Sequence, residues 1–312
     1  MKVKRSDFSF RSSNGINTIR GIKILPEDMP VKAVLQISHG MVEHYDRYID
    51  FMEYLASNGI AVYMHDHLGH KHSVDNDDQL GYFAHKNGYK HALNDLLHTA
   101  QMAKEENPGV KFFMLGHSMG SFYARVFAAT FPQVLDGVLI SGTGGPNKAA
   151  SIGLAAVNMM IKIKGEMHRS ETVNKMVFGE YLKKIDNPRT PSDWITRDEA
   201  IVDLYRRDKY CQFIFTLSGF RDLMNILSQA NDTPAFKDTP DNLPIYVFSG
   251  SMDPVGDYGM GIMKVVEGYR SAGCTDVTLK LYDGGRHEML NEINRQEVYS
   301  DVLKWIICKA EV

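Results

Sequence analysis

The chain has 312 residues, about twice the length of an average domain, which leaves room for one large domain or for a domain with an insertion. Apolar residues make up 44% of the chain and charged residues 23%, a composition that excludes disordered and fibrous proteins. The 35 basic and 38 acidic side chains nearly cancel and are spread along the chain, so we expect no nucleic-acid partner.

The first predicted element is a β-hairpin over residues 8–24. Phe8 and Phe10 alternate with polar residues, and Asn14-Gly15 follows as a turn signal, because this pair tolerates the positive φ of a tight turn. Short apolar strands and helical stretches then alternate. The strands are predicted at 34–37, 60–64, 112–115 and 138–140, and the helices at 48–55, 93–103 and 122–130.

The same alternation resumes near the C-terminus. Strands are predicted at 245–248 and 277–281, with helices around Val265 and through 302–306. Because these strands lack polar alternation and are joined by helices, we expect a mostly parallel, doubly wound sheet covered on both faces, which is the α/β class.

Between these two parts the strand pattern disappears. Apolar stripes at helical spacing cover residues 152–163 and 213–227, and the proline-containing loop 187–191 separates them. We therefore expect a core formed by residues 1–143 and 239–312, with residues 144–238 inserted as a helical cap. Most of each stripe should pack against its neighbours, and the rest should line an apolar pocket.

A nucleophile motif follows the strand at 112–115. In Gly116-His117-Ser118-Met119-Gly120, the serine would stand on a sharp turn between a strand and a helix. Such a turn strains the backbone at Ser118 and requires residues without side chains two positions before and after it. The alternative, a glycine-rich turn with a capping serine, is less consistent with a strand before the motif and a helix after it.

A serine nucleophile needs a base and an acid that orients the base. Asp253 follows the strand at 245–248 and His287 follows the strand at 277–281, where the mouth of a parallel sheet lies. The chain order Ser, Asp, His is the order of α/β-hydrolases. Asp257 is a second candidate for the acid.

An oxyanion hole needs two backbone donors. We expect one from the N–H of Met119, directly after the nucleophile, and one from the N–H of Met41 in the loop after the strand at 34–37. In that loop His39-Gly40 would let the backbone approach the substrate, although a tight loop alone would also explain this pair.

Together these segments resemble the monoacylglycerol lipase and lysophospholipase branch of the α/β-hydrolase superfamily. The resemblance is carried by Ser38-His39-Gly40, Glu43-His44, His65-Asp66-His67-Leu68-Gly69-His70, Gly116-His117-Ser118-Met119-Gly120, Asp253 and Gly284-Gly285-Arg286-His287-Glu288. It implies a serine esterase or lipase that uses Ser118, Asp253 and His287 under a mobile helical cap. Two positions depart from the family pattern, because Lys71 and Ser121 stand where glycine is common.

The histidines after the strand at 60–64 could instead indicate a metal. His65, His67 and His70 come close to the H-x-H-x-D-H signature of metallo-β-lactamase-type hydrolases, but Gly69 stands in the place of its aspartate. We therefore expect no metal and no cofactor, and we expect Asp66 and His67 to hold the loop by hydrogen bonds.

The resulting expectation is an acyl-enzyme mechanism on an apolar acyl ester of monoacylglycerol or lysophospholipid type. His39, Gly40, Phe213, Leu217 and Phe220 are the expected substrate contacts. An aminopeptidase or thioesterase could use the same triad, and a non-catalytic binding module on this scaffold is the alternative from a different class.

The cysteines and the N-terminal residues give an expectation about the cellular compartment of the protein. Cys211, Cys274 and Cys308 are an odd number without a C-x-x-C pair, so disulfides are not expected. The basic N-terminus lacks the apolar run of a signal peptide, and no apolar stretch reaches the roughly 18 residues of a membrane span. We therefore expect a cytoplasmic protein without a membrane anchor.

Overall fold

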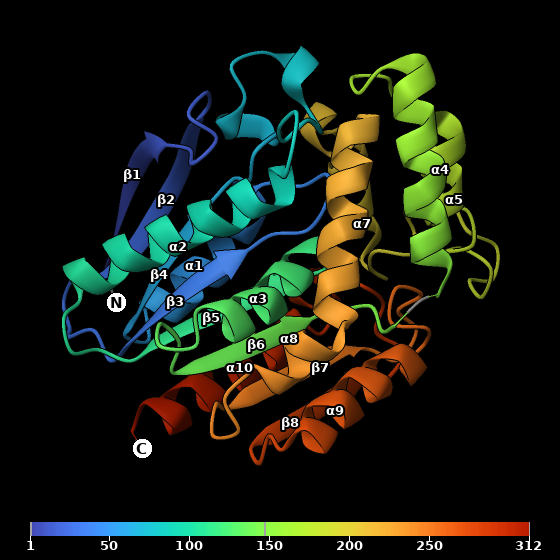
Figure 1. Cartoon of the computed structure of the whole chain (residues 1–312). Helices are drawn as coiled ribbons and strands as arrows, with labels where there is room; N and C mark the ends of the chain where they lie inside the picture. The colour runs from blue at the N-terminus through green and yellow to red at the C-terminus, as the bar shows by residue number, and fades with distance from the viewer. Residues whose placement is uncertain (1, 147, 312) are drawn as a thin grey trace.

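One sheet of eight strands organises the molecule, in the order β1-β2-β4-β3-β5-β6-β7-β8 (Figure 1). The structure is a computed structural model that describes residues 2–146 and 148–311, without the side chains of residues 148–152. The strands are β1 (Val3–Arg11), β2 (Thr18–Pro26), β3 (Ala33–Ser38), β4 (Ile60–His65), β5 (Phe112–His117), β6 (Gly137–Ser141), β7 (Ile245–Gly250) and β8 (Val277–Tyr282).

The N-terminal hairpin is confirmed, but its connection is longer than a two-residue turn. β1 pairs antiparallel with β2, and β2 pairs antiparallel with β4, so the hairpin extends one edge of the sheet. Six residues connect the strands, closed by a hydrogen bond of 2.9 Å from the N–H of Ser12 to the carbonyl of Asn17. Only Gly15 of the Asn-Gly pair takes a positive φ, of 71°.

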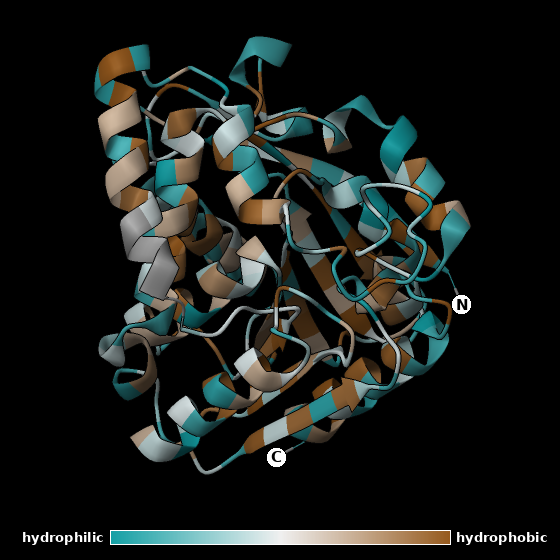
Figure 2. Ribbon diagram, turned by 90° about the vertical axis from the view of Figure 1, so that its right-hand side faces the viewer, coloured by the Kyte–Doolittle hydropathy of each residue, from teal (hydrophilic) through white to brown (hydrophobic). Residues whose placement is uncertain are grey.

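All other strand pairs are parallel, as the unbroken apolar runs predicted. Every residue of β3 to β7 is buried, because helices cover both faces of the sheet. Helices α2 (Gly88–Glu106), α3 (Met119–Thr130) and α9 (Met260–Ala272) pack on one face, and α1 (Ile49–Ala56) and α10 (Arg295–Ala310) on the other. In Figure 2 the central strands are largely brown, hence hydrophobic, and the helices around them carry both teal and brown residues.

The segment between β6 and β7 forms helices, as expected from its sequence. They are α4 (Lys148–Lys164), α5 (Glu171–Phe178), α6 (Glu199–Arg207), α7 (Leu217–Asn231) and α8 (Thr233–Lys237). In the described part of residues 144–238 no strand occurs beyond an isolated bridge between Arg169 and Thr216. We call residues 144–238 the inserted segment; α4 and α5 stand side by side at its outer end (Figure 1).

The two apolar stripes predicted in the inserted segment correspond to helices α4 and α7. The stripe at 213–227 begins too early, because Thr216 caps α7 by accepting a hydrogen bond of 3.1 Å from the N–H of Gly219, and Phe213 lies in the loop before it. Ile152, the first residue of the other stripe, lies outside the described side chains.

Candidate spans across a membrane were also sought. Among the described helices, none combines the length and the apolar character that crossing a bilayer requires.

Candidate active site

Ser118 stands on a strained turn between β5 and α3. Its φ of 53° and ψ of −120° lie outside the regions that residues with side chains favour, and its N–H donates a hydrogen bond of 2.9 Å to the carbonyl of Ser141. A side chain at Gly116 would collide with the carbonyl of Gly120, and one at Gly120 with the carbonyl of Ser38. The spacing of the motif is therefore a steric requirement of the turn.

His287 and Asp253 meet beside this turn. Nδ1 of His287 lies 3.0 Å from both carboxylate oxygens of Asp253, and both side chains are buried. The carboxylate is fixed in turn by the hydroxyl of Ser249, at 2.7 Å, and by the N–H of Val255, at 2.9 Å. Asp257, the second candidate for the acid, belongs to the following turn, and Asp253 is the residue that contacts the histidine.

The pair influences the protonation of both partners. Burial disfavours the charged forms, but the carboxylate of Asp253 and its hydrogen bond raise the pKa of His287 above its usual value. Burial likewise acts against the ionised carboxylate, yet the charge and hydrogen bond of His287 lower the pKa of Asp253. The imidazole is thereby held with Nδ1 toward the carboxylate of Asp253, which leaves Nε2 without a bond to that carboxylate.

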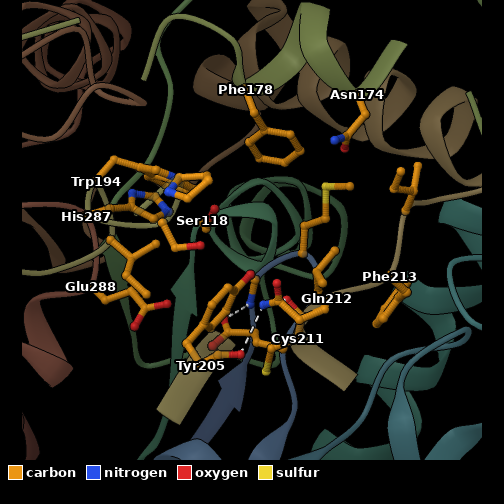
Figure 3. A pocket seen from close by; sticks show the side chains of 18 of the residues that line it. Ser118, Asn174, Phe178, Trp194, Tyr205, Cys211, Gln212, Phe213, His287 and Glu288 are labelled. Carbon is orange, nitrogen blue, oxygen red and sulfur yellow. Dashed lines mark hydrogen bonds between the residues drawn. The ribbon is translucent and has the colours of Figure 1, made fainter. Parts of the chain in front are cut away.

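The hydroxyl of Ser118 lies beside the ring of His287, close to the indole of Trp194 (Figure 3). Among the described residues no hydrogen bond joins the hydroxyl to the imidazole. Such bonds are often long before substrate binds.

The loop after β3 approaches the serine closely. A Cβ at Gly40 would lie 3.0 Å from the Cβ of Ser118 and 2.7 Å from Oε1 of Glu43, so only glycine fits there. In the described part of the chain, neither the N–H of Met41 nor that of Met119 has a hydrogen-bond acceptor. Two unused donors next to a serine are what an oxyanion hole requires.

A buried ionic network, which sequence reasoning missed, holds this loop. Glu43 accepts hydrogen bonds from the N–H of Gly40 and, at 2.8 Å, from the hydroxyl of Tyr48. Arg47 joins Glu43, at 2.9 Å, to both oxygens of Glu288, at 2.8 and 2.6 Å. The arginine charge lowers the pKa of Glu288 against the effect of burial. The network thus ties the loop after β3 to the residue that follows His287.

Two cavities meet at Ser118. One, of about 230 Å³, carries polar side chains and is called the polar cavity; its wall includes Asn174, Tyr205 and Gln212 (Figure 3). The other, of about 140 Å³, is called the apolar cavity. Its wall includes Phe122, Val177, Leu223, Leu227 and Val255, and Met41, Ser118, Phe178 and Trp194 line both cavities.

The expected substrate contacts divide into two groups. Gly40 and Phe213 line the polar cavity. His39, Leu217 and Phe220 are fully buried and line neither cavity, so the structure places them in the packed interior and corrects the expectation. The stripe of α7 faces the core with Leu217 and Phe220, and it reaches the apolar cavity one and two turns later, with Leu223 and Leu227.

The histidine cluster forms hydrogen bonds that hold the loops. Burial lowers the pKa of His65 to about 3 and that of His70 to about 4, so both are neutral. Both nitrogens of His39 are used, by the carbonyl of Gly40 at 2.7 Å and the N–H of His67 at 2.9 Å. Asp66 accepts a hydrogen bond of 2.7 Å from the N–H of Tyr45, and so fixes the loop after β3.

The two departures from the family pattern have local partners. Nζ of Lys71 lies 2.6 Å from Oδ2 of Asp46, and both residues line a cavity whose wall does not include Ser118. The hydroxyl of Ser121 donates a hydrogen bond of 2.5 Å to the carbonyl of Ser118. Ser121 therefore ties the strained turn to the first turn of α3.

Phe178 and Trp194 were missed because they lie in a part of the inserted segment without clear periodicity. Phe178 ends the short helix α5, whose start was marked by Ser170, an N-cap residue whose side chain accepts from the N–H of Val173 at 3.4 Å. Trp194 lies in a loop, and its own carbonyl oxygen accepts a hydrogen bond of 3.4 Å from the N–H of His287. Only the Ser170 cap could have indicated α5 from the sequence.

Comparison with known proteins agrees with this geometry. The monoacylglycerol lipase of Mycolicibacterium smegmatis is 25% identical over 306 residues, 97% of each chain. The monoglyceride lipase of Mus musculus is 27% identical over 282 residues, 88% of this chain and 82% of the mouse protein. The crystal structure of a thermostable carboxyl esterase from Bacillus coagulans, in complex with glycerol, superimposes with a TM-score of 0.91 at 29% identity and covers 97% of this chain and 99% of the esterase.

The family model described as serine aminopeptidase, S33, matches residues 29–294, most of the chain. The fold, the strained turn at Ser118 and the similarity to lipases all agree with this match. The chain is a serine hydrolase that belongs to the serine aminopeptidase S33 family, in the monoacylglycerol lipase-like branch of the α/β-hydrolase superfamily.

Proposed function

We propose that the protein is a serine-dependent carboxylic-ester hydrolase for monoacylglycerols or lysophospholipids. The observation that carries the proposal is the position of Ser118, where a cavity that carries both polar and apolar side chains meets a cavity with mainly apolar walls. An ester of a fatty acid and a polar alcohol has the same two-sided character around its carbonyl carbon. The acyl chain would occupy the apolar cavity, and the alcohol would occupy the polar one.

The reaction proceeds through an acyl-enzyme. Nε2 of His287 takes the hydroxyl proton of Ser118 as the oxygen attacks the ester carbonyl, and the N–H groups of Met41 and Met119 stabilise the oxyanion. The imidazolium then protonates the leaving alcohol, while Asp253 stabilises its charge. Water, deprotonated by the same imidazole, releases the fatty acid and restores Ser118.

The carboxylates at the site favour an ester over an aminopeptidase substrate, because a positively charged side chain already engages them. A free α-amino group is bound most strongly by a carboxylate that no other cation engages. Glu43 and Glu288 are the acidic residues that line the polar cavity, and both are engaged by Arg47. The apolar cavity has no acidic residue on its described wall.

A substrate panel tests the proposal. Purified protein should hydrolyse monoacylglycerols and lysophospholipids faster than aminoacyl anilides or acyl thioesters, and its rate should survive EDTA, since the proposed mechanism has no metal step. Cleavage of aminoacyl anilides alone would overturn the ester assignment, and loss of ester hydrolysis in EDTA by protein whose thermal unfolding EDTA leaves unchanged would overturn the metal-free mechanism.

A further inference from the structure

A second cluster of chemically reactive side chains lies next to the polar cavity, outside the proposed catalytic machinery. The ligand atoms of His44, Asp208 and Cys211 lie within 4.8 Å of one another. His44 comes from the loop after β3, whereas Asp208 and Cys211 come from the inserted segment, directly after α6. One imidazole, one carboxylate and one thiol are the donor types that zinc prefers.

The hydrogen bonding of His44 is incomplete while its imidazole is neutral. Its side chain is only 3% exposed, with Nε2 2.8 Å from Oδ2 of Asp208 and Nδ1 3.3 Å from Oδ2 of Asp46. A neutral imidazole has one N–H, so it can donate to only one of these carboxylates, and the lone pair of its other nitrogen then faces an oxygen. Among the described residues, Nδ1 of His44 has no partner that meets the geometry of a hydrogen bond, although it is buried.

A metal ion at Nε2 would remove this conflict. The proton would then sit on Nδ1 and point at Asp46, which is held by Nζ of Lys71 at 2.6 Å. A carboxylate behind the second nitrogen is the usual support of a metal-bound histidine. Asp208 can present Oδ2 to the ion while its Oδ1 accepts a hydrogen bond of 2.9 Å from the N–H of Tyr210.

We propose that His44, Asp208 and Cys211 bind a zinc-type divalent ion that ties the inserted segment to the loop after β3. Binding forms a sulfur–metal bond as the S–H bond of Cys211 breaks, and the proton passes to solvent. At zinc–ligand distances of about 2.0–2.3 Å a tetrahedral ion holds its ligand atoms roughly 3.3–3.8 Å apart, so Nε2 of His44 and Oδ2 of Asp208, now 2.8 Å apart, would separate to admit the ion. A third cavity, of about 320 Å³, is lined by all three residues and gives the ion a path from solvent.

The site bears on the active site through Cys211. The same side chain lines the polar cavity, and His44 lies three residues after Met41, the proposed oxyanion donor. A bound ion would therefore fix the position of the inserted segment over the polar cavity. It would take no part in the proposed hydrolysis, so metal binding and ester hydrolysis can be tested apart.

Cobalt(II) binding to the EDTA-treated, full-length protein tests the proposal. We expect one equivalent of cobalt to give a thiolate-to-cobalt charge-transfer band, zinc to displace it, and the midpoint of thermal unfolding to rise with zinc concentration. The chain has three cysteines, so matched variants locate the thiolate. The band should vanish in Cys211→Ser and remain in Cys274→Ser, a buried control, and in Cys308→Ser, an exposed one.

A second variant covers the case in which Cys211→Ser does not fold. Asp208→Asn keeps an oxygen for the N–H of Tyr210 but loses the charge, and it should weaken cobalt binding by about tenfold or more. No charge-transfer band in the wild-type protein, a band that survives in Cys211→Ser, or unchanged affinity in Asp208→Asn would overturn the proposal.

Discussion

At the scale of single residues, the account depends on the protonation of His287. The imidazole must be neutral to accept the proton of Ser118, while Asp253 raises its pKa in spite of burial. The neighbouring His117 has the opposite behaviour, because burial lowers its pKa to about 3 and keeps it neutral. Two histidines whose rings lie 4.7 Å apart thus differ because only one of them has a carboxylate partner.

The first prediction concerns the pH dependence of kcat/KM. Activity should fall as the pH drops through the pKa of His287, at a value above the ordinary 6.5 of an imidazole. Asp253→Asn should lower kcat by about 10⁴-fold and move this acid limb to lower pH, because the stabilising charge is gone. A pH–rate profile of both proteins measures this, and an acid limb below pH 6.5 in the wild-type protein would contradict it.

At the scale of elements, α7 has two functions along one helix. Its first turns pack into the core, while Leu223 and Leu227 reach the apolar cavity. Its middle meets the first turn of α2, where a side chain at Gly88 would lie against the carboxylate of Asp222. Burial raises the pKa of Asp222 to about 7, against the effect of the N–H groups of Tyr89 and Gly88.

The second prediction concerns acyl-chain length. Leu227→Trp should fill part of the apolar cavity and lower kcat/KM for octanoyl esters by about tenfold or more, with little change for acetyl esters. Leu204→Trp, on the exposed face of α6, is the matched control and should leave both rates unchanged. Equal losses of kcat/KM for acetyl and octanoyl esters in Leu227→Trp would show that α7 does not select the length of the acyl chain.

The third prediction concerns stability and pH. Well below pH 4 the carboxyl group of Asp222 is protonated in the folded and in the unfolded protein. Between about pH 4 and 7 it ionises in the unfolded protein but stays protonated in the folded one. The free energy of unfolding therefore falls as the pH rises. This loss amounts to about 4 kcal/mol above pH 7. Asp222→Asn should remove it, and urea unfolding at pH 4 and pH 8 should show a flatter profile. If the free energy of unfolding differed between pH 4 and pH 8 as much in Asp222→Asn as in the wild-type protein, Asp222 would be excluded as the cause of the pH dependence.

At the scale of the whole molecule, the active site joins segments that are distant in the sequence. The network of Glu43, Arg47 and Glu288 connects positions 241 residues apart. The loop containing Trp194 and Ile195 then bonds to the backbone of His287 and its neighbour Glu288. The inserted segment is thereby attached to the loop that carries His287 as well as to the sheet.

The fourth prediction tests this network. Arg47→Leu should lower the free energy of unfolding by about 3–5 kcal/mol, because it leaves two buried carboxylates without their positively charged partner. Arg5→Leu removes an exposed ion pair with Glu53 and should have a much smaller effect. Chemical denaturation of both variants makes the comparison, and equal losses would mean that burial of the network contributes nothing.

The core could be predicted from the sequence because its strands are buried on both faces and therefore read as unbroken apolar runs. The position of Ser118 could be predicted because steric limits force glycine at 116 and 120. The start of α7 and the presence of α5 and α6 could not, because short amphipathic helices depend on what they pack against. Arg47 left no local signal, since its partner Glu288 is near only in the folded chain.

Covalent labelling at Ser118 tests the central claim most directly. An organophosphate probe should label the wild-type protein once, at Ser118, as intact-mass and peptide analysis would show. Ser118→Ala should take no label and lose about 10³-fold or more of its ester hydrolysis, whereas Ser271→Ala, a distant surface control, should behave as wild type. Undiminished labelling or hydrolysis in Ser118→Ala would contradict the assignment of the nucleophile.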